Sequence, residues 1–111
     1  MPLNTRQVRV LRGLAHHLAP VLIVGSDRVT PAVAAELERQ LQAHELVKVK
    51  LLDADNDDVV TARDQLVAAT GAEHVQTIGH RLVFFRRNSD APKIAALPGE
   101  KLRPAAARGR R

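Results

Sequence analysis

The sequence predicts an α/β domain with the element order α-β-α-β-α-β-β, and three observations support that fold class. Apolar residues at helical spacing alternate with short apolar runs, which is typical of helices alternating with strands. A glycine turn at Gly25 and a helix start at Pro31 separate the first strand from the next helix. Gly79-His80 joins the last two apolar runs as a two-residue hairpin. This order predicts a four-stranded mixed sheet, with three parallel strands and one antiparallel strand.

The N-terminal half is predicted to contain two helices with a short strand between them. The first helix spans Thr5 to Leu18, where valines and leucines recur every three or four residues. Pro20 ends it, and the apolar run Val21–Val24 predicts a strand buried on both faces of a sheet. The second helix runs from Pro31 to about His44. The intervening turn leads into a helix start, where free backbone N–H groups suit an anion such as phosphate.

The second strand is predicted over Leu46–Leu52, and its alternating pattern gives it two unlike faces. Its valines point to one side, whereas Lys48 and Lys50 point to the other. In the following run, Asp53–Asp58, aspartates stand at alternate positions, as at the start of a calcium-binding EF-hand loop. Asp58 occupies the position that needs glycine, and a strand rather than a helix precedes the run. We therefore expect a solvated acidic loop without metal.

A third helix and a closing hairpin complete the part of the chain that is predicted to be ordered. The helix runs from about Val59 to Thr70, with Asp58 as its N-cap and Gly71 at its end. Two strands follow, at about His74–Ile78 and Arg81–Arg86, and a type II′ turn joins them.

Charge is distributed unevenly along the 111-residue chain. Residues 1–90 carry 11 Lys/Arg and 11 Asp/Glu, so the net charge of +5 comes wholly from the residues after Asp90. There Pro, Ala, Gly and Arg follow without periodicity, which predicts a basic, disordered tail at residues 89–111 after a domain at residues 1–88. A basic tail on a neutral domain indicates a polyanionic partner, and a solubilising tail is the alternative.

Several functional classes find no support in the sequence. The chain has no cysteine, which excludes disulfides and thiolate metal sites. No apolar run approaches the roughly 18 residues of a membrane span, and arginines interrupt the N-terminal segment, so a cytoplasmic protein is expected. The five histidines lack metal-ligand spacing, and we find no nucleotide-binding loop or specific catalytic set. We expect no catalytic residue, bound metal, cofactor or small-molecule substrate.

Three segments, preceded by Gly13-Leu14-Ala15-His16, carry a resemblance to a known family. They are Pro20–Gly25 (PVLIVG), His44–Lys50 (HELVKVK), and Val75–Gly79 (VQTIG) with Leu82–Arg86 (LVFFR). Over about residues 3–87 the chain is similar to the single-domain YhbY-like members of the CRM family, named for chloroplast RNA splicing and ribosome maturation. The resemblance implies a two-layer α/β fold like that of the C-terminal domain of translation initiation factor 3. It also implies that the last strand is inserted between the second and third.

The resemblance further implies RNA binding and association with precursors of the large ribosomal subunit. Members of the family carry a Gly-x-x-Gly turn after the first strand, comparable to the loop with which KH domains clamp nucleotides. The matching residues here are Gly25-Ser26-Asp27-Arg28, so arginine replaces the second glycine. Arginine tolerates a positive φ poorly, which favours another turn at this place. Its guanidinium suits bidentate contact with phosphate.

The residues predicted to contact RNA are Gly25, Ser26, Arg28, Lys48, Lys50 and Arg81. The first three form the turn, and for Arg28 an ordinary exposed turn residue is the alternative. The two lysines extend a phosphate track along one face of the sheet, and a solvated sheet face is the alternative for them. Arg81, Arg86 and Arg87 flank the last strand, and for these arginines solvated strand ends are favoured over RNA contact.

The sequence thus predicts a non-catalytic RNA-binding protein that acts in assembly of the large ribosomal subunit, with pre-ribosomal RNA as its partner. Phe84 and Phe85 are the two phenylalanines of a chain without Trp or Tyr, and both are expected in the core. Recognition through backbone and charge is therefore favoured over base stacking. The alternative is a protein-interaction module that docks on a ribosomal protein or assembly factor. RNA binding should weaken log-linearly with salt, which distinguishes the two.

Overall fold

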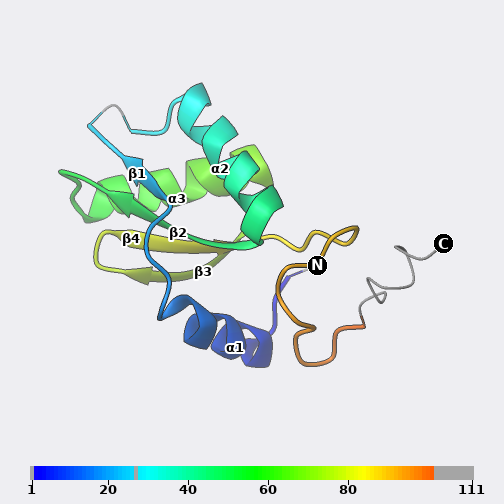
Figure 1. The fold of residues 1–111 in the computed structure, drawn as a ribbon. Helices are drawn as coiled ribbons and strands as arrows, with labels where there is room; N and C mark the ends of the chain where they lie inside the picture. Colours follow the sequence, from blue (N-terminus) through cyan, green and yellow to red (C-terminus); the bar gives the residue numbers. More distant parts are fainter. Residues whose placement is uncertain (1, 27, 102–111) are drawn as a thin grey trace.

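Three helices and a four-stranded sheet make up the part of the chain that the computed structural model describes, residues 2–26 and 28–101 (Figure 1). The elements are α1 (Thr5–Ala15), β1 (Leu22–Val24), α2 (Pro31–His44), β2 (Leu46–Leu51), α3 (Asn56–Thr70), β3 (Glu73–Ile78) and β4 (Arg81–Phe85). The strand order is β1-β2-β4-β3; β1 runs parallel to β2, and β4 runs antiparallel to both of its neighbours. The predicted α/β fold and the insertion of the last strand between the second and third are confirmed.

The two faces of the sheet are covered differently. In Figure 1, α2 and α3 lie on one side of the sheet and α1 lies on the other. The larger core lies beneath α2 and α3 and includes Val24, Leu37, Leu41, Val47, Val49, Leu51, Leu66, Leu82 and Phe84. A smaller core lies beneath α1 and includes Leu11, Ala15, Leu46, Val75, Val83, Phe85 and Leu97. Phe84 and Phe85 are both buried, as predicted, and they serve different cores because successive strand residues face opposite sides.

Helix α1 begins at Thr5 as predicted but ends at Ala15 rather than Leu18. At its start Asn4 and Gln7 form a reciprocal capping box. At its end the Leu18 N–H bonds to the Ala15 carbonyl, and the chain then leaves the helix. Leu18 stays 37% exposed, so its helical spacing in the sequence does not correspond to a packing contact in the core.

Helix α3 begins at Asn56 rather than Val59, and Asp55 rather than Asp58 is its N-cap. The Asp55 carboxylate accepts from the Asp58 N–H at 2.8 Å, and the Asp58 carboxylate accepts from the Asp55 N–H at 3.0 Å. This second bond is the main reason that the pKa of Asp58 lies below its ordinary value. Gly71 ends the helix in the left-handed conformation at φ 72°, as predicted.

Strand β1 lies at an edge of the sheet, and the prediction that its apolar run is buried on both faces is wrong. Val24 is fully buried beneath α2 and α3, whereas Ile23 is 58% exposed and Val21 is 43% exposed. Helix α1 packs on β2 and β3 and leaves the second face of β1 open. The apolar run therefore forms a strand that is covered on one face only.

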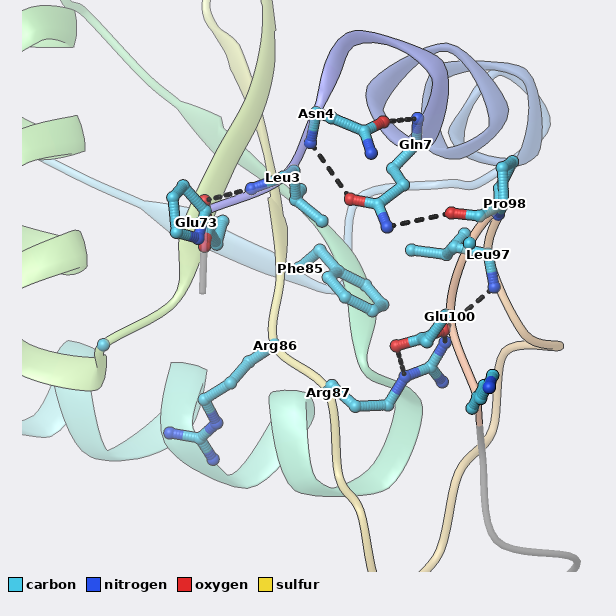
Figure 2. A pocket seen from close by; sticks show the side chains of 14 residues that line it. Leu3, Asn4, Gln7, Glu73, Phe85, Arg86, Arg87, Leu97, Pro98 and Glu100 are labelled. Atoms are coloured by element: carbon cyan, nitrogen blue, oxygen red, sulfur yellow. Dashed lines mark hydrogen bonds and ion pairs between the residues drawn. The ribbon is translucent and has the colours of Figure 1, made fainter.

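Residues 89–101 do not form the disordered segment that the sequence predicts; they fold back onto the domain. Leu97 is 3% exposed and belongs to the core beneath α1, where Ile94 packs beside it. Figure 2 shows Leu97 next to Phe85, and Glu100 next to Arg87. Leu97, Ile94 and a few specific bonds hold this segment, and these contacts follow no periodicity in the sequence that would reveal them. Residues 102–111, which hold all four arginines of the predicted tail, lie outside the described residues.

Candidate nucleic-acid interface

The C-terminal ends of β1, β2 and β3 and the start of β4 meet at one edge of the sheet, which we call the carboxyl edge. The Leu52 N–H donates to the Val24 carbonyl at 2.9 Å, and the Leu51 N–H donates to the His80 carbonyl at 2.8 Å. These bonds join the end of β2 to β1 on one side and to the β3–β4 hairpin on the other. The residues predicted to contact RNA that gather here are Gly25, Ser26, Arg28, Lys50 and Arg81.

The turn after β1 has a left-handed residue at the position where the resemblance implies a second glycine. Arg28 has φ 62°, and its N–H donates to the Gly25 carbonyl at 3.0 Å. The expected change to another turn is therefore not observed, and Arg28 keeps the left-handed conformation. Gly25 itself has no positive φ, and a Cβ there would meet no atom within 4 Å.

The guanidinium of Arg28 explains how the left-handed conformation is held. Its Nη1 donates to the carbonyls of Gly25 and Leu52, at 3.2 and 2.8 Å. Its Nη2 donates to the Asp53 carbonyl and, at 3.1 Å, to the Asp58 carboxylate. The four terminal N–H hydrogens thus have partners within the chain. These bonds offset the roughly 1–2 kcal/mol that a left-handed φ costs a non-glycine residue. Arg28 braces the turn against the β2–α3 loop.

The start of α2 is capped by its own side chains. The Thr30 hydroxyl accepts from the Val33 N–H at 3.2 Å, and Pro31, which has no N–H, is the first residue of the helix. Both features reduce the number of free N–H groups that the sequence pattern offers to an anion. Asp27, inside the same turn, lies outside the described residues.

Lys50 and Arg81 are direct cross-strand neighbours on β2 and β4. Paired residues point to the same face of a sheet, and here it is the face that carries α1. Arg81 is exposed and Lys50 is half-buried. Among the described residues, neither side chain forms an ion pair. The carboxyl edge therefore presents two adjacent positive charges beside the turn.

Lys48 shares the face of Lys50, as predicted, but lies further from the carboxyl edge. It pairs with Val83 and is only 7% exposed, so most of its side chain is buried. Together with Leu14, Leu18, Val21, Lys93 and Ile94, it lines an apolar groove of about 610 Å³. Lys48 is thus set apart from the five residues at the carboxyl edge.

At the opposite edge, Arg86 is bound rather than solvated, contrary to the prediction for the end of the last strand. Its two terminal nitrogens contact the Glu38 carboxylate of α2 at 2.6 and 2.5 Å, and Nη1 also donates to the Thr70 carbonyl at 2.8 Å. The bonds to the guanidinium hold the pKa of Glu38 below its ordinary value. Arg86, directly after β4, thereby connects the middle of α2 to the end of α3.

Arg87 forms an ion pair with Glu45, a buried residue that the sequence did not indicate as important. Glu45, directly after α2, is fully buried and has φ 66°. Its carboxylate accepts from Arg87 Nη1 at 2.8 Å and from the N–H groups of Lys93 and Ile94 at 2.6 and 2.8 Å. Its position within the segment His44–Lys50, which carries the family resemblance, was the one signal in the sequence that could have drawn attention to it.

Glu100 completes this contact from the other side of Arg87. Its carboxylate oxygens lie 2.6 and 3.0 Å from the guanidinium, which lowers the pKa of Glu100 (Figure 2). One of these oxygens also accepts from the Leu97 N–H at 2.8 Å. We call Glu45, Arg87 and Glu100, with the segment 88–101 that they hold, the clasp.

Comparisons with known proteins show the family to which the chain belongs. The family model described as the CRS1/YhbY (CRM) domain matches residues 3–86. The chain belongs to the CRM family. Two relatives of this CRM domain are an RNA-binding protein of Haemophilus influenzae and a Pseudomonas aeruginosa protein named as a probable RNA-binding protein. The first is 45% identical over 89 residues, covering 80% of this chain and 90% of the relative. The second is 43% identical over 88 residues, covering 79% and 85%.

The structure of this CRM domain also resembles a solved one. The solution structure of a hypothetical Staphylococcus aureus protein, described as a candidate RNA-binding protein, matches it with a TM-score of 0.70 and 32% identity. The match covers 78% of this chain and 90% of the other. The clasp segment of this CRM domain follows the residues 3–86 that the family model matches.

Within residues 2–26 and 28–101, no three His, Asp or Glu side chains gather closely enough to hold a metal ion. The helices in the same ranges are too short or too polar to cross a membrane.

Proposed function

We propose that this CRM domain is a non-catalytic, cytoplasmic RNA-binding protein that associates with precursors of the large ribosomal subunit during assembly. Its family, and relatives named for RNA binding, support the first part of the proposal. The observation that carries it is the pair Lys50 and Arg81, adjacent at the carboxyl edge and without an ion pair among the described residues. The ribosomal partner rests on the family resemblance alone.

In the proposed mode of binding, phosphates approach the carboxyl edge from the face that carries α1. Lys50 and Arg81 supply charge there, and the backbone of Gly25 and Ser26 supplies hydrogen bonds. Arg28 acts by keeping the turn in shape, because its terminal nitrogens already bond within the chain. The acidic loop 53–58 on the α3 side repels phosphate, so RNA runs across the open face rather than over α3.

The salt dependence of binding tests this mode. Removing one phosphate-binding cation lowers the slope of log K against log salt by about 0.7–0.9. The double variant K50Q/R81Q is therefore expected to lower the slope for large-subunit precursor RNA by about 1.5. Arg39→Gln on α2, at a side chain paired with Glu36, is the matched control and should leave the slope unchanged. An unchanged slope in the double variant would contradict the proposed site. Absence of RNA binding would favour docking on a protein.

The tail is proposed to add attraction that does not depend on RNA sequence. Ending the chain after Lys101 removes four arginines, at positions 103, 108, 110 and 111, and leaves the clasp intact. If all of them meet phosphate, the salt slope falls by up to about 3. An unchanged slope would remove the tail from the mechanism. Crosslinking in cells, with mapping of the bound RNA, tests the ribosomal partner separately.

A further inference from the structure

A single row of side chains crosses all four strands near the carboxyl edge. The register pairs Ile23 with Lys50, Lys50 with Arg81, and Arg81 with Ile78. Each strand therefore contributes one residue, in the order Ile-Lys-Arg-Ile across the sheet. Directly paired residues point to the same face, so two cations stand side by side between two isoleucines. We call these four residues the open row.

Three members of the open row are exposed and Lys50 is half-buried, unlike the part of the same face that α1 covers. Ile23 is 58% exposed and Ile78 is 43% exposed. Further along β4 on this face, Val83 and Phe85 are 0% and 3% exposed, because α1 and the clasp segment cover them. Two large aliphatic side chains that flank unpaired cations on an uncovered sheet face are typical of an interaction surface.

We propose that the open row binds unpaired nucleotides of single-stranded RNA, an inference that rests on the proposed function. Phosphates bind at Lys50 and Arg81, and the faces of unstacked bases pack against Ile23 and Ile78. In an A-form duplex the base faces are hidden by stacking, so the isoleucines would find no base face to contact. In a single strand the bases splay out and expose those faces. The planar guanidinium of Arg81 also offers a stacking surface.

Composition and charge both favour this occupant. Stacking on phenylalanine rings is not available on this sheet, because Phe84 and Phe85 are buried in the two cores. The isoleucines, which are apolar, and the planar guanidinium of Arg81 take the place of such rings. The two positive charges occupy the centre of the open row, and no described carboxylate pairs with them. A polyanion with apolar bases is complementary to that arrangement.

The test compares an unpaired RNA oligonucleotide with a hairpin duplex built from the same sequence. The double variant I23S/I78S should bind the unpaired RNA about tenfold more weakly, because less apolar surface remains to cover the bases. Its salt slope should stay unchanged, since both phosphate-binding cations are kept. Duplex binding should also stay unchanged. Val60→Ser on α3, at a residue 44% exposed, is the matched control and should change neither affinity.

A conservative variant controls for the possibility that any substitution at these two positions weakens binding. I23L/I78L keeps the aliphatic surface and should keep the affinity for unpaired RNA. Unchanged binding of I23S/I78S to unpaired RNA, while K50Q/R81Q still lowers the salt slope, would overturn the inference and leave RNA binding at the carboxyl edge standing. Equal weakening on unpaired and duplex RNA would also overturn it. Failure of the unaltered protein to bind either RNA would overturn the proposed function as well.

Discussion

Strand β4 has basic residues at both ends, and the two ends use them differently. At its start Arg81 is exposed beside Lys50, and neither forms an ion pair among the described residues. Past its end, Arg86 and Arg87 bind carboxylates, and the side chain of Arg87 is only 13% exposed. The same residue type is therefore open to a ligand at one edge of the sheet and part of the framework at the other.

The difference follows from which carboxylates remain available at each edge. At the carboxyl edge, Asp58 already binds Arg28 and, as the third residue of α3, accepts from the N–H of the N-cap Asp55. At the opposite edge, Glu45 is folded into the interior and needs donors, which Arg87 and the segment 88–101 supply. A buried carboxylate thus determines which arginine is bound within the fold. The arginines without such a partner are the candidates for RNA contact.

The largest expected effect is that of removing Glu45. Glu45→Ala removes one partner of a buried ion pair and leaves backbone N–H groups without acceptors, so we expect a decrease of about 3–5 kcal/mol in the free energy of unfolding. Urea denaturation measures it. The control is Glu38→Gln, at a side chain 43% exposed, where the decrease should stay below about 1 kcal/mol. Similar decreases for both would remove the contrast between a buried and an exposed partner.

A smaller decrease is expected for Leu97, which attaches the clasp segment to the core. Leu97→Ala should lower the free energy of unfolding by about 2 kcal/mol, the lower end for a buried leucine, because the segment can readjust. Leu18→Ala, at a residue 37% exposed, should cost less than about 0.5 kcal/mol. Equal stability of Leu97→Ala and the unaltered protein would show that residues 89–101 do not belong to the folded domain.

At the carboxyl edge, two substitutions of Arg28 distinguish the cost of its left-handed φ from the contribution of its guanidinium bonds. Arg28→Ala and Arg28→Gly both remove the guanidinium bonds, but glycine also relieves the left-handed φ. Arg28→Gly should therefore be more stable than Arg28→Ala by about 1 kcal/mol. The reverse order in thermal unfolding would contradict the role of φ. The salt slope of RNA binding should be the same for Arg28→Gly as for the unaltered protein, and a fall would reveal a direct phosphate contact instead.

The smallest effect is a loosening of the clasp in acid. The bonds to Arg87 lower the pKa of Glu100, so the stability that it contributes is complete above its unfolded pKa of about 4.3 and is lost as the pH falls through the lowered folded value. Methyl NMR signals of Ile94 and Leu97 should shift as the pH falls below the ordinary range of a glutamate and through the lowered pKa of Glu100. In Glu100→Gln this pH-dependent shift should be reduced. An unchanged shift in that variant would assign the loosening to another carboxylate.

Much of the fold could be predicted because it depends on short-range patterns. The bounds of α2, Pro31–His44, follow from proline, capping threonine and helical spacing. The opposite faces of Lys48 and Val47 follow from the two-residue period of a strand. Gly79, at φ 59°, occupies the first position of the predicted hairpin turn. Each of these features is decided by residues a few positions apart.

The remaining features depend on residues that are distant in sequence. Whether Ile23 is buried depends on where α1 packs, and its own segment carries no sign of that. The burial of Glu45 depends on Arg87 and on the folding back of residues 88–101. The inward direction of the Arg28 guanidinium depends on carbonyls of the β2–α3 loop. No local period encodes such pairings.

By itself, the sequence determined the order of the elements, the two faces of β2 and the residues that could carry positive charge to an RNA. Only the tertiary structure decided which of those charges are available. Lys50 and Arg81 are left open at the carboxyl edge, Lys48 is covered, and Arg86 and Arg87 are bound. The physical reason is that periodicity and capping act over a few residues, whereas burial and ion pairing depend on which strands and helices the fold brings together.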